Sequence, residues 1–155
     1  MYMKLKEKPV YLDVCALGRP YDDQSFMRIG IESTAVQLII AYVKLGRFGL
    51  YYSPVHIREI GSNPDEIVRA DLLVLLYGIG KNAKQMIQPE ILKKRGSELM
   101  AVGIDAADAF HVAHAEQVNA AFITCDDRLL KKYCSVGNKI WSGTPVEFCK
   151  KEGLL

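Results

Sequence analysis

The chain has 155 residues, half of them hydrophobic and a quarter charged, which favours a single globular domain over residues 1–155. Its formal net charge of +2 is too small to indicate a nucleic-acid partner by itself. No apolar run approaches the length of a membrane span, and the opening "MYMKLKEKPVYL" lacks a secretory signal pattern, so we expect a cytoplasmic protein without membrane contact. The four cysteines form no C-x-x-C pair and are expected to be free thiols.

Short β-type runs alternate with longer helical ones, which predicts an α/β fold with parallel strands. The first strand is expected at about Val10–Asp13. Apolar residues at helical spacing predict a helix over about Arg28–Leu45, with Gly46 as its stop. The run "FGLYYS" that follows is typical of a second strand.

The middle of the chain carries three helix-start signals. Ser53 as N-cap and Pro54 at the first helical position predict a helix with Glu59 in its second turn. The run "NPDE" at 63–66 has the spacing of a capping box and predicts a helix to about Tyr77. The segment from there to residue 88 gives no clear pattern, and a further helix is expected from near residue 89 to about 103.

The last third begins with a strong helix signal in "GIDAADAFHVAHAEQVNA". Asp105 is a natural N-cap for this helix, and Asp108 follows three residues later. The strand-like "AAFITC" ends at Asp126, and a short helix is expected over 128–133. "KIW" is expected to be the last strand, and "TPVE" at 144–147 predicts a capping box for a terminal helix.

Two of the predicted strands therefore end at an aspartate, Asp13 and Asp126. In parallel sheets, ligand sites lie beyond the carboxyl ends of the strands, and helices start at that same edge. Glu59 and Asp108 each lie near a helix start, so we expect all four acids to face one cleft. Clustered carboxylates repel one another unless a cation neutralises them, and oxygen ligands suit Mg²⁺ or Mn²⁺. An ion held in this way could activate water and stabilise a phosphoryl group, which is the chemistry of a nuclease or phosphatase.

Three segments of the sequence resemble the PIN domain family, which includes ribonuclease toxins of the VapC type. They are "VYLDVCALGRPYDDQ", "SPVHIREI" and "GIDAADAFHVAHAEQVNAAFITCDDRLLKK", in which D-A-x-H-x-A followed by a strand and T-x-D is the most specific match. The resemblance spans nearly the whole chain and is weakest from about 71 to 100. It implies a three-layer α/β/α sandwich with a mainly parallel central sheet.

The resemblance also implies an activity and a set of site residues. By motif, Asp13, Glu59, Asp108 and Asp126 match the four acids with which family members hold one or two Mg²⁺ or Mn²⁺ ions and hydrolyse RNA. Asp13, Asp108 and Asp126 are expected to bind the metal, with Asp127 as the alternative to Asp126. Val14-Cys15 stands where the family often has Thr-Asn or Thr-Ser, which removes a hydroxyl or amide beside the first aspartate.

Each candidate has a structural interpretation as well. Asp13 could bond the turn that follows or pair with Arg19, Glu59 could be a solvated helix residue, and Asp108 could serve the helix macrodipole. Asp126 could be the N-cap of the helix after it, Asp105 is better explained as an N-cap than as a ligand, and Asp127 is expected to be exposed.

Five residues that are not acidic also have structural interpretations: Arg19, His111, His114, Tyr11 and Trp141. Arg19 could meet a phosphate or pair with Asp22 or Asp23. We expect His111 to be packed and hydrogen-bonded, His114 to be partly exposed, and neither to be the general base. Tyr11 and Trp141 are assigned to packing.

The function expected from the sequence is thus a metal-dependent endoribonuclease that could be the toxin of a toxin–antitoxin pair. The expected partners are RNA, a small antitoxin that blocks the acidic cleft, and a second copy of the chain. The apolar residues of the helix at about 28–45 could serve that homodimer, although core packing is their simpler use. Two alternatives stay open: an RNA- or protein-binding module that keeps the acids for metal-dependent stability, and a structure-specific DNA nuclease.

Overall fold

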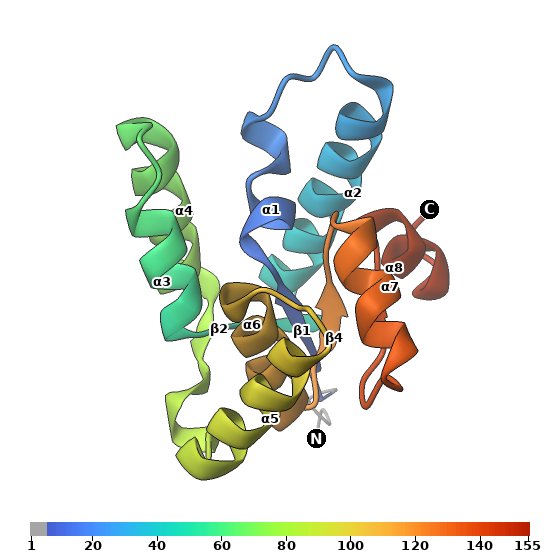
Figure 1. The fold of residues 1–155 in the computed structure, drawn as a ribbon. Helices are drawn as coiled ribbons and strands as arrows, with labels where there is room; N and C mark the ends of the chain where they lie inside the picture. The colour runs from blue at the N-terminus through green and yellow to red at the C-terminus, as the bar shows by residue number, and fades with distance from the viewer. Residues whose placement is uncertain (1–5) are drawn as a thin grey trace, which may run out of the picture.

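A parallel β-sheet forms the centre of the protein, whose computed structural model describes residues 6–155 (Figure 1). Every strand pair in this described part is parallel, and the strand order is β3-β2-β1-β4-β5. The strands are β1 (Lys8–Leu12), β2 (Phe48–Tyr52), β3 (Lys81–Asn82), β4 (Ala121–Ile123) and β5 (Ser142–Gly143). The central position of β1 makes its end the natural place for a site.

Helices cover both faces of the sheet and give the expected three-layer α/β/α architecture. One layer holds α1 (Val14–Leu17), α2 (Met27–Lys44), α3 (Pro54–Gly61), α4 (Glu66–Ile79) and α8 (Pro145–Lys151); the other holds α5 (Pro89–Ala101), α6 (Ala106–Gln117) and α7 (Asp127–Ser135). Short 3₁₀ helices, η1 (Arg19–Tyr21) and η2 (Ala83–Met86), complete the elements. None of the helices within residues 6–155 is long and apolar enough to cross a membrane.

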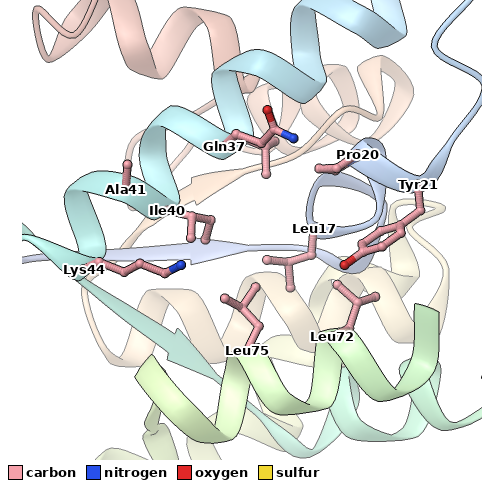
Figure 2. Close-up of a pocket in the computed structure, with 10 residues that line it drawn as sticks. Leu17, Pro20, Tyr21, Gln37, Ile40, Ala41, Lys44, Leu72 and Leu75 are labelled. Carbon is pink, nitrogen blue, oxygen red and sulfur yellow. The ribbon is translucent and has the colours of Figure 1, made fainter. Parts of the chain in front are cut away.

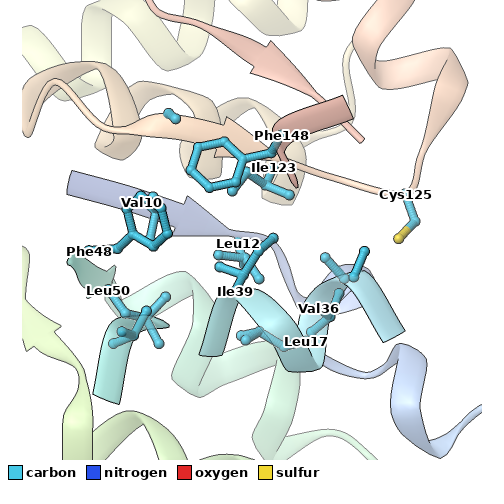
Figure 3. Packing of buried hydrophobic residues seen from close by; sticks show 14 of the residues in the cluster. Val10, Leu12, Leu17, Val36, Ile39, Phe48, Leu50, Ile123, Cys125 and Phe148 are labelled. Atoms are coloured by element: carbon cyan, nitrogen blue, oxygen red, sulfur yellow. The ribbon is translucent and has the colours of Figure 1, made fainter. Parts of the chain in front are cut away.

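Alternation along β1 divides the hydrophobic core between the two faces. Val10 and Leu12 point into the cluster beneath α2 and α8, where Ile39 and Phe148 meet them (Figure 3). Tyr11 points into the opposite cluster, under α5 and α6. Side chains of successive strand residues point to opposite faces, so one strand can serve both cores. All three of these β1 side chains are fully buried.

The buried face of α2 shows how the apolar residues of this helix pack. Ala35, Val36, Ile39 and Val43 lie in the core cluster, so core packing is the use of these apolar residues. Ile31 is about half exposed and does not share that role.

Several predicted boundaries are wrong, each for a local reason. The last strand was expected at "KIW" (139–141), but β5 lies at 142–143. Ile140 is apolar because its side chain is buried in the core, and hydrogen bonding to β4 begins only at the Trp141 carbonyl. The N-cap of α4 is Asp65, which accepts from the Ile67 and Val68 N–H groups, whereas Asn63 bonds the Asp65 N–H in a preceding turn. The helix α1 and the edge strand β3 were not predicted.

Candidate active site

Four acidic side chains meet at the carboxyl edge of the sheet. Asp13 directly follows β1, Asp126 follows β4, Glu59 lies on α3 and Asp108 is in the first turn of α6. All four line one pocket of about 260 Å³. Its other lining residues are Val14, Cys15, Arg19, His111 and Cys125. The parallel strands therefore bring together acids that are up to 113 positions apart in the sequence.

Asp13 is the most deeply buried of these acids, with 3% of its surface exposed. One carboxylate oxygen accepts from the Ala16 N–H (3.0 Å) and from the Cys15 thiol (2.9 Å), and the other accepts from the Thr124 hydroxyl. Burial is the main cause that raises the pKa of Asp13 well above its usual value, and the neighbouring Cys15 adds to it. Asp13 thus bonds the turn that follows, as N-cap of α1, and does not pair with Arg19.

Cys15 takes over part of the role that a hydroxyl or amide would have beside the first aspartate. Its Sγ donates to Asp13 Oδ1, and Thr124 supplies a hydroxyl from β4's end on the other side. The departure at Val14-Cys15 therefore does not leave the Asp13 carboxylate without side-chain donors.

Glu59 is fixed by a partner that sequence reasoning missed. Its Oε1 lies 2.7 Å from His111 Nε2, and its side chain is one-third exposed. His111 is fully buried and hydrogen-bonded, as expected, but its contact with Glu59 joins α6 to α3 across 52 positions. The one sequence signal was the spacing of His111 three residues after Asp108, which puts both on one side of α6.

The pKa of Asp108 depends on burial and on the charges of neighbouring side chains. It is partly buried, and desolvation is the main cause that raises its pKa. The negative charges of Asp126, Glu59 and Asp105 raise the pKa of Asp108 further, while His111 opposes them. This mutual repulsion is the electrostatic condition that a bound cation would relieve.

The choice between Asp126 and Asp127 is clear in the geometry. Asp126 lines the pocket and is also the N-cap of α7, accepting from the Arg128 and Leu129 N–H groups (3.0 and 3.1 Å). Asp127 is exposed, as expected, and forms a bidentate ion pair with Arg28 (2.7 and 2.9 Å), which lowers the pKa of Asp127. Asp127 does not line the pocket.

The two remaining candidates behave differently. Arg19 lines the pocket while its guanidinium bonds Asp22 (3.0 Å) and the buried Glu32 (3.2 Å). Asp23 accepts from the Ser25 N–H instead. Asp105 occupies the N-cap position of α6 without a side-chain capping bond, is exposed, and lies outside the pocket lining.

Two histidines depart from expectation. His114 was expected to be partly exposed, but it is buried because α6 is covered by α5 and the sheet, and its Nδ1 lies 2.7 Å from the Phe110 carbonyl. His56 was not singled out at all. It is fully buried beneath the pocket, with Nδ1 accepting from the Ser53 N–H (3.1 Å) and Nε2 2.6 Å from the Leu12 carbonyl.

The donor set suits a hard divalent cation without forming a finished site. Four carboxylates around one pocket are the oxygen ligands that Mg²⁺ and Mn²⁺ prefer, and Mg²⁺ keeps several waters when bound. Within residues 6–155, however, no three His, Cys, Asp or Glu side chains already converge on one point. Three of the four carboxylates instead form hydrogen bonds within the protein. Asp126 caps α7, Asp13 accepts from Thr124 and Cys15, and Glu59 is bonded to His111.

Comparisons with known proteins agree with this picture. A family model described as PIN domain matches residues 65–134. Among solved structures, FitAB bound to an IR36 DNA fragment is 17% identical and superposes with a TM-score of 0.55, covering 88% of this chain and 94% of that one. FitAcB from Neisseria gonorrhoeae is 14% identical with a TM-score of 0.52, covering 88% and 97%. At such identities the likeness is one of fold. No curated protein sequence matches the chain.

Proposed function

We propose that this chain is a PIN-domain protein, which the family-model match over residues 65–134 and the fold shared with its structural neighbours support, and that it is a metal-dependent ribonuclease that hydrolyses RNA phosphodiester bonds. Nuclease activity is typical of the family. The observation that carries the proposal is the gathering of Asp13, Glu59, Asp108 and Asp126 around one pocket at the carboxyl edge of the sheet. The negative charges of Asp126, Glu59 and Asp105 help to raise the pKa of Asp108, and this repulsion supports a positive ligand there.

Each residue has a distinct part in the proposed reaction. Asp13, Asp108 and Asp126 hold one or two Mg²⁺ or Mn²⁺ ions, directly or through water, and Glu59 completes the pocket. Such an ion, when bound, lowers the pKa of water and stabilises charge on the phosphate. Arg19, fixed by Asp22 and Glu32, brings a positive charge to the rim of the pocket where a phosphate would approach.

A second pocket supports single-stranded RNA as the substrate. Tyr52 and Tyr77 contact each other edge to face, with ring centroids 5.9 Å apart, and Tyr77 is 61% exposed. They line a pocket of about 380 Å³ together with Arg58 and Lys84. Exposed aromatic rings beside cationic side chains suit unpaired bases and phosphates. Arg58 directly precedes Glu59 on α3, so one strand could reach both pockets.

We also propose a small antitoxin as a protein partner, since the structural neighbours are FitAB assemblies. A largely apolar groove of about 330 Å³ between η1, α2 and α4 would suit an apolar segment of that partner (Figure 2). Leu17, Ile40, Leu72 and Leu75 point into it. A homodimer remains a further proposal, to be measured by light scattering after size exclusion.

The test is cleavage of an RNA pool by the purified chain with Mg²⁺ or Mn²⁺, with and without EDTA. We expect cleavage that EDTA abolishes and that falls at least about 100-fold in Asp13→Asn and Asp108→Asn, because each removes a charged ligand. Asp127→Asn is the matched control, since that carboxylate pairs with Arg28 outside the pocket.

Parallel reactions with structured RNA and flapped DNA separate the alternatives. Cleavage of flapped DNA alone would replace the ribonuclease with a DNA nuclease. A rise in melting temperature with Mg²⁺ but no cleavage of any nucleic acid would leave a binding module. Full activity in the Asp13 and Asp108 variants would remove the mechanism.

A further inference from the structure

A row of buried polar groups runs from the core into the acidic pocket. Ser53 Oγ lies 2.7 Å from the Tyr11 hydroxyl, which lies 2.6 Å from His111 Nδ1. The other imidazole nitrogen, Nε2, lies 2.7 Å from Glu59 Oε1. Ser53 and Tyr11 are fully buried, His111 is 1% exposed, and only Glu59 reaches solvent. Burial is the main cause that raises the pKa of the Tyr11 hydroxyl, so this hydroxyl stays protonated.

The chemistry of these groups orders the hydrogen bonds. An ionised carboxylate can only accept, so His111 Nε2 must carry the proton that meets Glu59. In the neutral imidazole, Nδ1 then accepts from the Tyr11 hydroxyl, and Tyr11 accepts from Ser53. Every donor in the row points toward Glu59.

Glu59 depends on this contact for its position. Among residues 6–155, His111 is the single hydrogen-bond partner of the Glu59 carboxylate. A glutamate side chain that is one-third exposed can adopt several rotamers, so a fixed hydrogen-bond donor is needed to hold one of them. His111 has no such freedom, because its ring is bonded to Tyr11 and stacks edge to face with His56, 4.7 Å between centroids.

We propose that His111 is the positioning residue of the acidic pocket. Its Nε2–H holds Glu59 Oε1, Tyr11 fixes the ring behind it, and Oε2 of Glu59 is left free to accept a hydrogen bond from the attacking water. His111 also sits one helical turn from Asp108, so a single imidazole sets the relation between acids of α3 and α6. This inference rests on the proposed ribonuclease function.

The test compares two amides at one position. In His111→Gln, the side-chain amide nitrogen reaches the place of Nε2 and can still donate to Glu59. In His111→Asn, the shorter amide reaches only the place of Nδ1, so the bond to Glu59 is lost. We expect His111→Asn to lower the single-turnover rate at least about tenfold, with RNA binding changed less than about threefold, and His111→Gln to restore most of the rate. Tyr11→Phe, which keeps the buried ring, should fall between them.

Stability is measured alongside the rate. Equal rate losses in the Gln and Asn variants, or losses that simply follow their melting temperatures, would assign His111 a structural role and overturn the proposal.

Mn²⁺ binding by calorimetry separates this proposal from the ribonuclease itself, because it needs no cleavage. Glu59→Gln and His111→Asn are expected to weaken Mn²⁺ binding to a similar extent, and the double variant should be no weaker than Glu59→Gln alone. If no nucleic acid is cleaved but this coupling is found, the proposed function fails and the positioning role stands. Additive losses in the double variant would refute the positioning role even in an active ribonuclease.

Discussion

His56 shows how a single side chain can tie core stability to pH. It is fully buried, its Nδ1 accepts from the Ser53 N–H, and burial is the main cause that lowers its pKa well below the usual value, with His111 adding to the effect. The His56 imidazole therefore binds a proton near pH 6.5 in the unfolded chain, whereas in the folded protein it stays neutral at that pH. The stability that His56 contributes is present above that pH and is lost as the pH falls, by at most about 1.4 kcal/mol per pH unit.

We expect the free energy of unfolding of the natural protein to decrease relative to that of His56→Asn when the pH is lowered from 7.5 to 5.5. The Asn variant is less stable at pH 7.5 but keeps an acceptor for the Ser53 N–H. The gap between the two proteins should narrow by about 1 kcal/mol over this range, as measured by urea unfolding. Asp13 works in the opposite sense, because its raised pKa favours the folded state on acidification, and it is present in both proteins. A constant gap would show that His56 does not titrate on unfolding.

The four acids could be predicted from the sequence, and their partners could not. Asp13 and Asp126 follow apolar runs, and a parallel sheet brings the ends of such runs together. The bond between His111 and Glu59 depends on how α6 packs against α3, and no local pattern encodes that distance. His56 was missed for the same reason, since its partners include the Leu12 carbonyl on β1, 44 positions away.

Helix α7 and the pocket share one residue, and this allows the two roles of Asp126 to be measured separately. Asn is as good an N-cap as Asp, so Asp126→Asn should keep the stability of the protein within a few tenths of a kcal/mol. Asp126→Ala removes the bonds to the Arg128 and Leu129 N–H groups and should cost about 1 kcal/mol. Both variants should lose RNA cleavage. An active Asp126→Asn protein would leave Asp126 with the capping role alone.

At the scale of elements, the capping signal at 144–147 predicted a helix start, the one at 63–66 was two residues early, and apolar runs predicted strand ends poorly. The box of Thr144 and Glu147 forms as expected at α8, with bonds of 3.1 and 3.2 Å, since it needs only four consecutive residues. The strand β5 lies later than "KIW" because a buried residue and a paired residue look alike in sequence. The short α1 begins after Asp13, which caps it; a bond from Asp13 to the turn that follows was one of the interpretations that the sequence left open.

Folding of the whole molecule brings four acidic side chains together at one edge of its sheet. The four acids of the pocket lie on the same edge, and Asp13 is buried there. Mn²⁺ that binds only the folded state should therefore stabilise it, by about 2.7 kcal/mol when free Mn²⁺ is about 100 times its dissociation constant. The check is the melting temperature with Mn²⁺ and with EDTA.

Asp13→Asn makes this prediction specific. The variant should melt higher than the natural protein in EDTA at neutral pH, because no ionisable carboxyl group remains at this buried position, and should gain little from Mn²⁺. An equal gain in both proteins would mean that the ion binds elsewhere on the molecule.

The thiol of Cys15 has a practical consequence for chemical labelling. It is exposed, yet it donates to Asp13, and the neighbouring Cys125 thiol together with desolvation raises the pKa of Cys15 far above that of an ordinary cysteine. Alkylating reagents attack the thiolate, so iodoacetamide should modify Cys15 slowly at neutral pH in spite of its access to solvent. A reagent that does couple there would carry its bulk into the acidic pocket and report directly on what enters it.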